Sequence, residues 1–200
     1  MEYAPHGNLK DFLKQICRDS IATEQELMVF GVQIARGMHF LESKKCIHGD
    51  LAARNVLVGD NFIMKIADFG FSRYVKGTNG FPINPNNKLP IRWMSIETLE
   101  GKDYDSSCDV WSFGVVLWEI LTLGEEPYLH TATTNLYNFL NMGNRLEKPP
   151  LCSNEMYVMM RQCWNSVPKQ RPTFGELVRD LEYMCNNQGG NINAALQNEY

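Results

Sequence analysis

Three side chains in the first part of the sequence could together accept a proton and hold a metal ion: Asp50, Asn55 and Asp68. A carboxylate within hydrogen-bond reach can take the proton of a hydroxyl group, and carboxylate and amide oxygens are ligands that suit Mg²⁺. Taken singly, each residue has a plainer reading, as a loop residue, a turn residue or a helix cap. The joint spacing of the three favours a general base beside a magnesium site.

The length and composition are those of one soluble globular domain. The chain has 200 residues, of which 44% are hydrophobic and 21% are charged, and such a chain can bury a sizeable core. The net charge of −4 argues against a nucleic-acid partner, because nucleic-acid-binding proteins normally carry a basic face.

The cysteine pattern indicates reduced thiols, and the longest apolar run indicates that this segment does not contact a membrane. The six cysteines are scattered without a Cys-x-x-Cys pair, which fits reduced thiols in the cytosol better than disulfides or a zinc site. No signal-peptide pattern opens the chain. The apolar run 110–123 contains Glu119 and is shorter than the ~20 residues that span a bilayer. We expect it to be a buried helix.

The first half of the chain predicts two helices and a hairpin. A short helix is expected at 7–13, entered from a turn. Thr23 and Glu26 form a capping-box pattern, after which apolar residues at helical spacing predict an amphipathic helix of roughly 20 residues. Two short β-rich runs, 55–58 and 62–66, predict a hairpin.

The second half is predicted to be helical after a long loop. Residues 71–87 are rich in Gly, Asn and Pro, which predicts a loop, and long loops in compact domains tend to be functional. Helices are expected at 109–123, 155–164 and 172–185, the last beginning with Pro172 and carrying a capping box of Thr173 and Glu176. The tail 186–200 is expected to be mobile.

Five motifs in order resemble the C-terminal lobe of a protein tyrosine kinase. They are His48–Asn55, Ala67–Gly70, Leu89–Met94, Asp109–Gly114, and Cys163–Trp164 with Gln170–Phe174. The set is most similar to receptor tyrosine kinases of the fibroblast growth factor receptor group, over residues ~2 to 186. The resemblance implies a protein-kinase-like α+β fold, C-terminal lobe only, mostly α-helical with a small β hairpin.

The parts of that family that precede the C-terminal lobe have no counterpart in this sequence. There is no G-x-G-x-x-G loop and no Val-Ala-x-Lys strand, so the N-terminal lobe is expected to be absent. The resemblance implies a hinge remnant at 1–6 and a C-lobe at 7–186, followed by a mobile tail at 187–200. Within the lobe it implies a catalytic loop at 48–55 and an activation segment at 68–97.

The resemblance assigns the catalytic chemistry to Asp50 and Arg54. Asp50 would be the catalytic base, or would orient the attacking hydroxyl. Arg54, four residues later, would help neutralise the transferred phosphate or support Asp50. Because serine/threonine kinases carry a lysine where this chain has Ala52, the loop resembles the tyrosine-kinase version.

The resemblance also implies a binding site for ATP and Mg²⁺. Asn55 and Asp68 would be the magnesium ligands, because a hard cation binds oxygen donors. Glu2 and Ala4 in the hinge, together with Leu57, would contact the adenine.

Other motif residues are expected to be structural. His48 and Phe69 would stack in an apolar column. Asp109 would cap the buried helix and also anchor the catalytic loop. Glu97 and Arg171 would form a buried ion pair that ties the activation segment to the helical base.

At three places the sequence departs from the family pattern in residues linked to the regulation of kinase activity. Gly49 stands where the family has the arginine that pairs with activation-loop phosphate, and Gly80 and Phe81 occupy the paired tyrosine positions. Tyr74 is the one tyrosine of that loop, and Ser-Ile-Glu at 95–97 replaces Ala-Pro-Glu. We therefore expect activation by loop autophosphorylation to be lost, while the catalytic residues remain.

The leading function is that of a protein tyrosine kinase fragment in receptor-type signalling, with protein tyrosine as substrate and very low activity of these residues alone. The alternative is a truncated or pseudokinase-like binding module without phosphotransfer. A third function is that of a signalling substrate in which Tyr200 becomes a phosphotyrosine docking site. The plainer alternative is that a tyrosine occurs at this position by chance. The segment would be cytoplasmic, as the intracellular portion of a single-pass membrane receptor.

Overall fold

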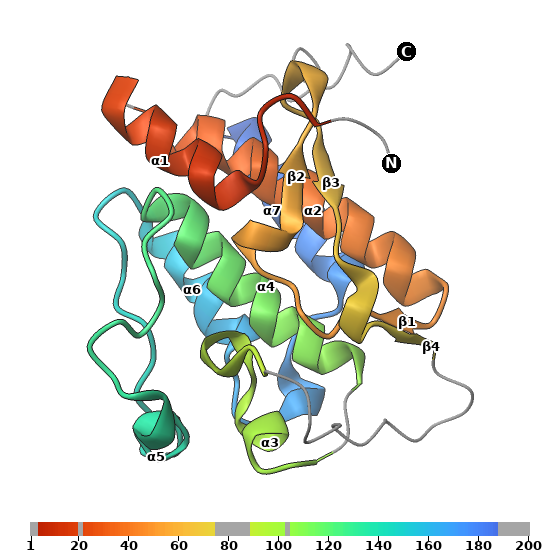
Figure 1. The fold of residues 1–200 in the computed structure, drawn as a ribbon, viewed down its shortest axis with the longest axis vertical. Helices are drawn as coiled ribbons and strands as arrows, with labels where there is room; N and C mark the ends of the chain where they lie inside the picture. Colours follow the sequence, from red (N-terminus) through yellow and green to blue (C-terminus); the bar gives the residue numbers. More distant parts are fainter. Residues whose placement is uncertain (1–3, 20–21, 75–88, 103–104, 188–200) are drawn as a thin grey trace.

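The computed structural model describes residues 4–19, 22–74, 89–102 and 105–187 (Figure 1). The predictions for Glu2, for Gly80 and Phe81, and for most of the tail fall outside these residues. Helix α7 continues to Asn187, so the residues at the predicted start of the tail, 186 and 187, are helical.

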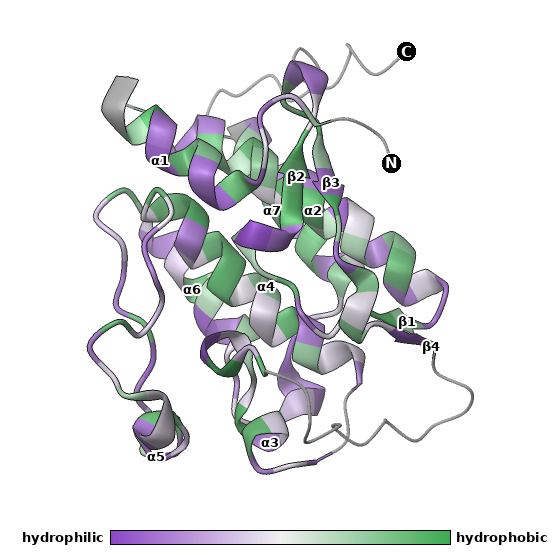
Figure 2. Cartoon of the chain, viewed as in Figure 1, coloured by the Kyte–Doolittle hydropathy of each residue, from purple (hydrophilic) through white to green (hydrophobic). Residues whose placement is uncertain are grey.

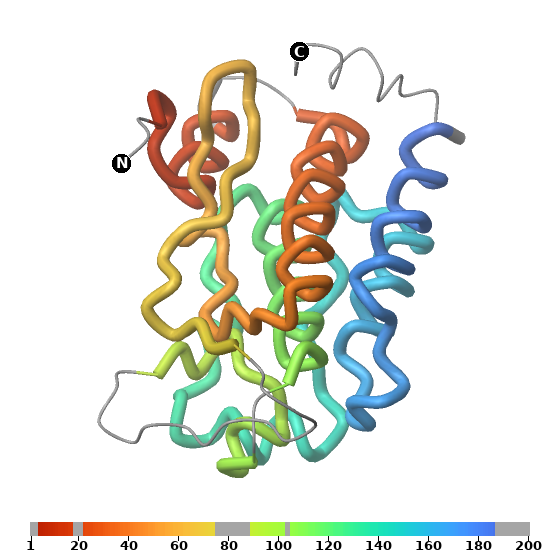
Figure 3. The backbone as a smooth tube through the Cα atoms, turned by 90° about the vertical axis from the view of Figure 1, so that its right-hand side faces the viewer, coloured from red at the N-terminus to blue at the C-terminus, as the bar shows by residue number. Residues whose placement is uncertain are grey.

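The architecture is a set of helices packed around α4. The longer helices are α1 (Leu9–Asp19), α2 (Glu24–Ser43), α4 (Ser106–Leu121), α6 (Asn154–Cys163) and α7 (Phe174–Asn187), and two short ones are α3 (Ile96–Leu99) and α5 (Leu136–Asn141). Helix α4 packs against α2 and α6, and α2 lies side by side with α7 (Figure 3). No helix in the described part of the chain is both long enough and apolar enough to cross a bilayer.

Two small antiparallel sheets accompany the helices. β2 (Val56–Val58) pairs with β3 (Met64–Ile66), which confirms the predicted hairpin with shorter strands. β1 (Cys46–Ile47) pairs with β4 (Arg73–Tyr74), so the beginning of the predicted long loop is a strand. This second pair holds the segment after Asp68 against the segment before the catalytic loop.

Helix α2 begins at the capping box that the sequence indicates. Thr23 Oγ1 accepts from the Glu26 backbone N–H at 3.3 Å, and the Thr23 N–H donates to Glu26 Oε2 at 2.9 Å. The helix has 20 residues, as predicted. At Gly31 an added Cβ would lie 2.8 Å from Leu117 Cδ2, so the glycine lets α2 approach α4 closely.

Helix α4 is buried along nearly its whole length, and most of its ribbon is apolar (Figure 2). It begins at Ser106, where the Asp105 side chain accepts from the Ser107 N–H at 2.8 Å. The prediction that Asp109 caps this helix is therefore wrong, because Asp105 occupies the cap. Asp109 lies one turn inside the helix and is buried, so its carboxylate is free to serve another segment.

The second predicted capping box is present at the start of α7, but the helix does not begin at the predicted residue, Pro172. The Thr173 N–H donates to Glu176 Oε2 at 2.8 Å, and Thr173 Oγ1 accepts from the Glu176 N–H at 3.2 Å. Thr173 is thus the cap and the helix starts at Phe174, which leaves Pro172 outside it. Helix α1 is longer than expected, and the short helices α3 and α5 were not predicted.

Candidate active site

Asp109 fixes the loop that carries Asp50. Its two carboxylate oxygens accept from the backbone N–H groups of His48, at 2.7 Å, and Gly49, at 2.9 Å. Burial raises the pKa of Asp109 to about 6, although the two backbone hydrogen bonds oppose this shift. Gly49 has φ +78°, a left-handed conformation that glycine adopts readily. The predicted anchoring of the catalytic loop by Asp109 is confirmed.

Asp50, Arg54 and Asn55 meet in one cluster. Asp50 Oδ1 accepts from Arg54 Nη2 at 2.5 Å, and Asp50 Oδ2 accepts from Asn55 Nδ2 at 2.9 Å. Asn55 Nδ2 also donates to the Asp50 carbonyl at 2.7 Å. Burial raises the pKa of Asp50, while the charge of Arg54 and the Asn55 hydrogen bond lower it. Both carboxylate oxygens are therefore held in fixed directions.

The end of strand β3 docks on this cluster. The Ala67 N–H donates to the Asn55 carbonyl at 2.8 Å, and the Ala67 carbonyl lies 3.0 Å from His48 Nε2. His48 Nδ1 accepts from the Asp50 N–H at 3.2 Å, so Nε2 carries the proton and donates to Ala67. The His48 ring also contacts Phe69, with ring centroids 5.2 Å apart, as the stacking prediction requires.

Asp68 follows Ala67 and so comes next to the cluster. Its backbone is left-handed, with φ 61° and ψ 69°, and its Oδ1 accepts from the Gly70 N–H at 3.3 Å. Its negative charge is near enough to raise the pKa of Asp50. Because Asp50 holds the Asn55 amide nitrogen, Asn55 Oδ1 is available as a cation ligand, as is the exposed Asp68 carboxylate. This donor set suits Mg²⁺.

A groove of about 600 Å³ is lined in part by Asp50 and Arg54. The guanidinium of Arg54 lies over the Trp93 ring, 4.2 Å from its centroid. Arg92 Nη1 donates to the Pro127 carbonyl at 3.0 Å, which fixes a second wall. The remaining lining residues are Leu89, Pro90, Ile91, Glu126 and Thr133.

The predicted adenine contacts are only partly described. Leu57 is half-buried in β2, and Ala4 is half-buried in the segment before α1. That segment runs along β2, because the Val58 N–H donates to the Gly7 carbonyl at 2.9 Å and the His6 N–H to the Val58 carbonyl at 3.3 Å. The segment carrying Ala4 therefore lies beside the strand carrying Leu57, while Glu2 is outside the described residues.

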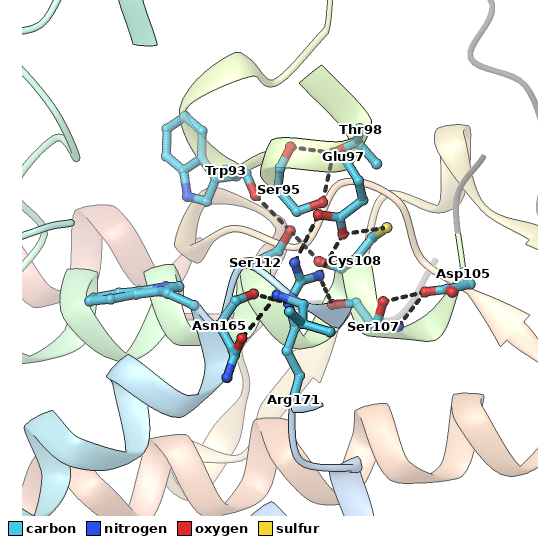
Figure 4. A network of polar contacts seen from close by, with 12 residues as sticks. Trp93, Ser95, Glu97, Thr98, Asp105, Ser107, Cys108, Ser112, Asn165 and Arg171 are labelled. Carbon is cyan, nitrogen blue, oxygen red and sulfur yellow. Dashed lines mark hydrogen bonds and ion pairs between the residues drawn. The ribbon is translucent and has the colours of Figure 1, made fainter. Parts of the chain in front are cut away.

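The predicted Glu97–Arg171 ion pair is confirmed and is bidentate. Arg171 Nη1 and Nη2 donate to Glu97 Oε1 and Oε2 at 2.5 and 2.8 Å (Figure 4). Arg171 also donates to the carbonyls of Ser107, at 3.0 Å, and Asn165, at 2.9 Å. The pair joins α3, the start of α4 and the loop before α7.

One buried residue of the site was not predicted. Glu119 is completely buried in α4, and its Oε2 accepts from the Ala53 N–H and from Trp93 Nε1, both at 2.9 Å. Burial raises its pKa to about 7. The sequence signal was an acidic residue inside an otherwise apolar helix, which must find partners when it is buried.

The protein tyrosine and serine/threonine kinase family model matches residues 1–181. The chain belongs to this family. Fibroblast growth factor receptor homolog 2 of Drosophila melanogaster is 48% identical over 216 residues, with 98% of this chain and 20% of the relative covered. Fibroblast growth factor receptor 1 of Pleurodeles waltl is 46% identical over 195 residues, with 91% and 24% covered. The fibroblast growth factor receptor of Hydra vulgaris is 45% identical over 192 residues, with 92% and 24% covered.

These matches confirm the resemblance to receptor tyrosine kinases of the fibroblast growth factor receptor group, and the chain is a protein tyrosine kinase by family. The helical architecture with small antiparallel sheets agrees with the predicted C-lobe-like fold. The chain spans only 20 to 24% of the length of these three relatives.

Proposed function

We propose that this chain is the C-terminal catalytic lobe of a receptor-type protein tyrosine kinase, which transfers the γ-phosphate of ATP to tyrosine in protein substrates. One observation carries the proposal. The Asp50 carboxylate is held between Arg54 and Asn55, and Asp50 lines an open groove. A proton acceptor is thus fixed where a side chain entering the groove would arrive.

In the proposed reaction the tyrosine hydroxyl oxygen forms a bond to the γ-phosphorus of ATP, and the bond from that phosphorus to the leaving ADP oxygen breaks. The hydroxyl proton passes to the Asp50 carboxylate. Arg54 orients this carboxylate and offsets the negative charge around the transferred group. Because the transfer depends mainly on positioning and charge neutralisation, the fixed geometry of Asp50 is the main contribution of the loop.

We assign the magnesium site to Asn55 and Asp68, and the adenine contacts to Glu2, Ala4 and Leu57. Magnesium, when bound, would neutralise the phosphate charge. The docking of Ala67 on Asn55 supports this assignment, because it brings Asp68 next to the catalytic loop. Tyrosine rather than serine as acceptor is supported by Ala52 in the catalytic loop.

We propose the domain layout that the motifs imply. Residues 1–6 belong to the hinge and residues 7–186 to the lobe, with the catalytic loop at 48–55 and the activation segment at 68–97. In a receptor this segment would be cytoplasmic and would act on protein tyrosine. Loop phosphorylation would not control it, because Gly49 replaces the arginine that would bind the phosphate.

A chimera tests the function. These 200 residues contain no glycine-rich loop or strand lysine, so we expect them alone to bind MgATP weakly and to phosphorylate peptides at a very low rate. Fusion to the N-terminal lobe of a fibroblast growth factor receptor should give phosphorylation of a tyrosine peptide, and Asp50→Asn should abolish it. A folded chimera that binds peptide without phosphorylating it would instead favour the binding-module alternative.

A further inference from the structure

A single oxygen atom of Glu119 connects the catalytic loop to the wall of the groove. Glu119 Oε2 accepts from the Ala53 N–H in the loop and from Trp93 Nε1 in the wall, each at 2.9 Å. Oε1 has no hydrogen-bond partner among the described residues. Burying a carboxylate is costly. The two hydrogen bonds that Glu119 accepts come from the segment that carries Asp50 and from the segment that carries Trp93.

Trp93 is fixed to α4 at two points. Its indole N–H is held by Glu119, and its carbonyl accepts from Ser112 Oγ at 2.8 Å. The side chain is 7% exposed, so little of the ring faces solvent. Helix α4 therefore determines both the position and the tilt of the indole.

The indole in turn supports the arginine that orients Asp50. Arg54 lies 4.2 Å from the Trp93 centroid, and its Nη2 lies 2.5 Å from Asp50 Oδ1. A cation over an indole face is attracted by the negative face of the ring, provided that the ring keeps its orientation. If the indole rotated, Arg54 would lose this support and Asp50 would lose one of its two fixed partners.

We infer that Glu119 is a positioning residue for the substrate site: its carboxyl group orients Trp93, which holds Arg54 against Asp50 at the place where the substrate tyrosine binds. This inference rests on the proposed function and deepens it. Glu119 is not itself a lining residue of the groove, and its carboxyl group bonds to Ala53 and Trp93 rather than to Asp50. It acts through the indole N–H, so the effect of Glu119 should depend on that N–H.

The test uses NMR of the 200-residue chain, with the Arg54 side-chain resonances as the readout. Those resonances should be displaced by the ring current of Trp93 in the wild type. Glu119→Met removes both acceptor oxygens, so it should reduce the displacement and weaken binding of a tyrosine-containing peptide by about tenfold. Trp93→Phe keeps an aromatic ring but removes the indole N–H. It should weaken peptide binding similarly, and the double variant should be no weaker than either single variant.

Glu147→Met is the matched control, because it makes the same chemical change at an exposed position, and it should alter neither readout. Unchanged Arg54 resonances and peptide affinity in Glu119→Met, with only lower stability, would overturn the inference. So would fully additive effects of the two substitutions. A wild-type chain that binds no tyrosine peptide would overturn the proposed function, whereas the Arg54 resonances would still decide whether Glu119 positions that side chain.

Discussion

Arg171 and Glu97 meet through two parallel hydrogen bonds although they lie 74 positions apart in the chain. The Arg171 side chain is completely buried, and that of Glu97 is 12% exposed. Arg171 makes further bonds to two backbone carbonyls, so α3 and the start of α4 are held to one guanidinium (Figure 4). Helix α3, which lies at the end of the proposed activation segment, is thereby anchored to the helical core.

Breaking this pair from one side should be severely destabilising. Arg171→Met would leave the Glu97 carboxylate buried without its partner, and we expect a loss of ~3–5 kcal/mol in the free energy of unfolding, measured by urea titration. Burial raises the pKa of Glu97, but the hydrogen bonds and charge of Arg171 outweigh it and the net pKa is lowered. The contribution of the pair is therefore present above pH 4.5 and should be lost as the pH falls through the lowered pKa.

The control for that substitution is Lys102→Met, which removes the exposed ion pair with Glu100. Solvent screens such a pair, so stability should change little. An Arg171→Met protein as stable as the Lys102→Met protein would contradict the anchoring role.

Two aspartates of the same helix should respond differently to the same substitution. Asp109→Asn replaces one acceptor oxygen by an N–H donor that faces the amides of His48 and Gly49, and we expect a loss of ~2 kcal/mol or more. Asp105→Asn should change stability little, because Asn caps a helix as well as Asp does. Urea unfolding gives both values. Hydrogen exchange at the His48 and Gly49 amides should accelerate only in Asp109→Asn, and equal exchange in both variants would exclude the anchor.

Substitution of Gly49 measures how far a side chain at this position of the catalytic loop lowers the free energy of unfolding. With φ +78°, an added Cβ would lie 3.1 Å from the Phe71 carbonyl oxygen and 3.4 Å from Phe71 Cβ. Gly49→Ala should therefore lower the free energy of unfolding by more than the ~1–2 kcal/mol expected from a left-handed residue alone. Gly143→Ala is the matched control, because Gly143 has φ +89° and no atom within 4 Å of an added Cβ. Equal losses would show that the Phe71 contact is irrelevant.

Local signals in the sequence predicted the parts of the fold that depend on neighbouring residues. The capping box of Thr23 and Glu26 fixed the start of α2, since its hydrogen bonds span only three residues. The cap of α4 was misplaced because the apolar run begins after Asp109, whereas the helix extends through polar residues back to Ser106. A hydrophobic pattern does not reveal polar residues in a first turn.

Features that depend on distant residues were not predictable in the same way. Strands β1 and β4 have two residues each and pair across the hairpin, so neither carries an alternating pattern of its own. For the candidate site, the motif spacing predicted that Asp50, Asn55 and Asp68 act together. The structure brings Asp50 and Asn55 into contact, and Asp68 directly follows Ala67, which bonds to Asn55. The partners of Glu119 were hidden, because Ala53 and Trp93 come to it from two different segments only in the folded chain.

Glu119 should make stability depend on pH near neutrality. Its pKa is raised by burial from 4.5 to about 7, so between these values the folded protein keeps a proton that the unfolded chain has lost. Stability should therefore fall as the pH rises through this range, with a slope of up to ~1.4 kcal/mol per pH unit from this group. Glu119→Gln removes the titrating group. Urea unfolding from pH 5 to 8 should show a smaller decline for the variant than for the wild type.

Asp109 also has a raised pKa, of about 6, and contributes a slope of the same sign in both proteins. The difference between wild type and Glu119→Gln removes that shared contribution, so what remains belongs to Glu119. This difference should grow up to about pH 7 and then stay constant, because above that pH both the folded and the unfolded wild-type chains are ionised at Glu119. A difference that does not change with pH would mean that Glu119 is already ionised at pH 5, and that its two N–H donors outweigh the effect of burial.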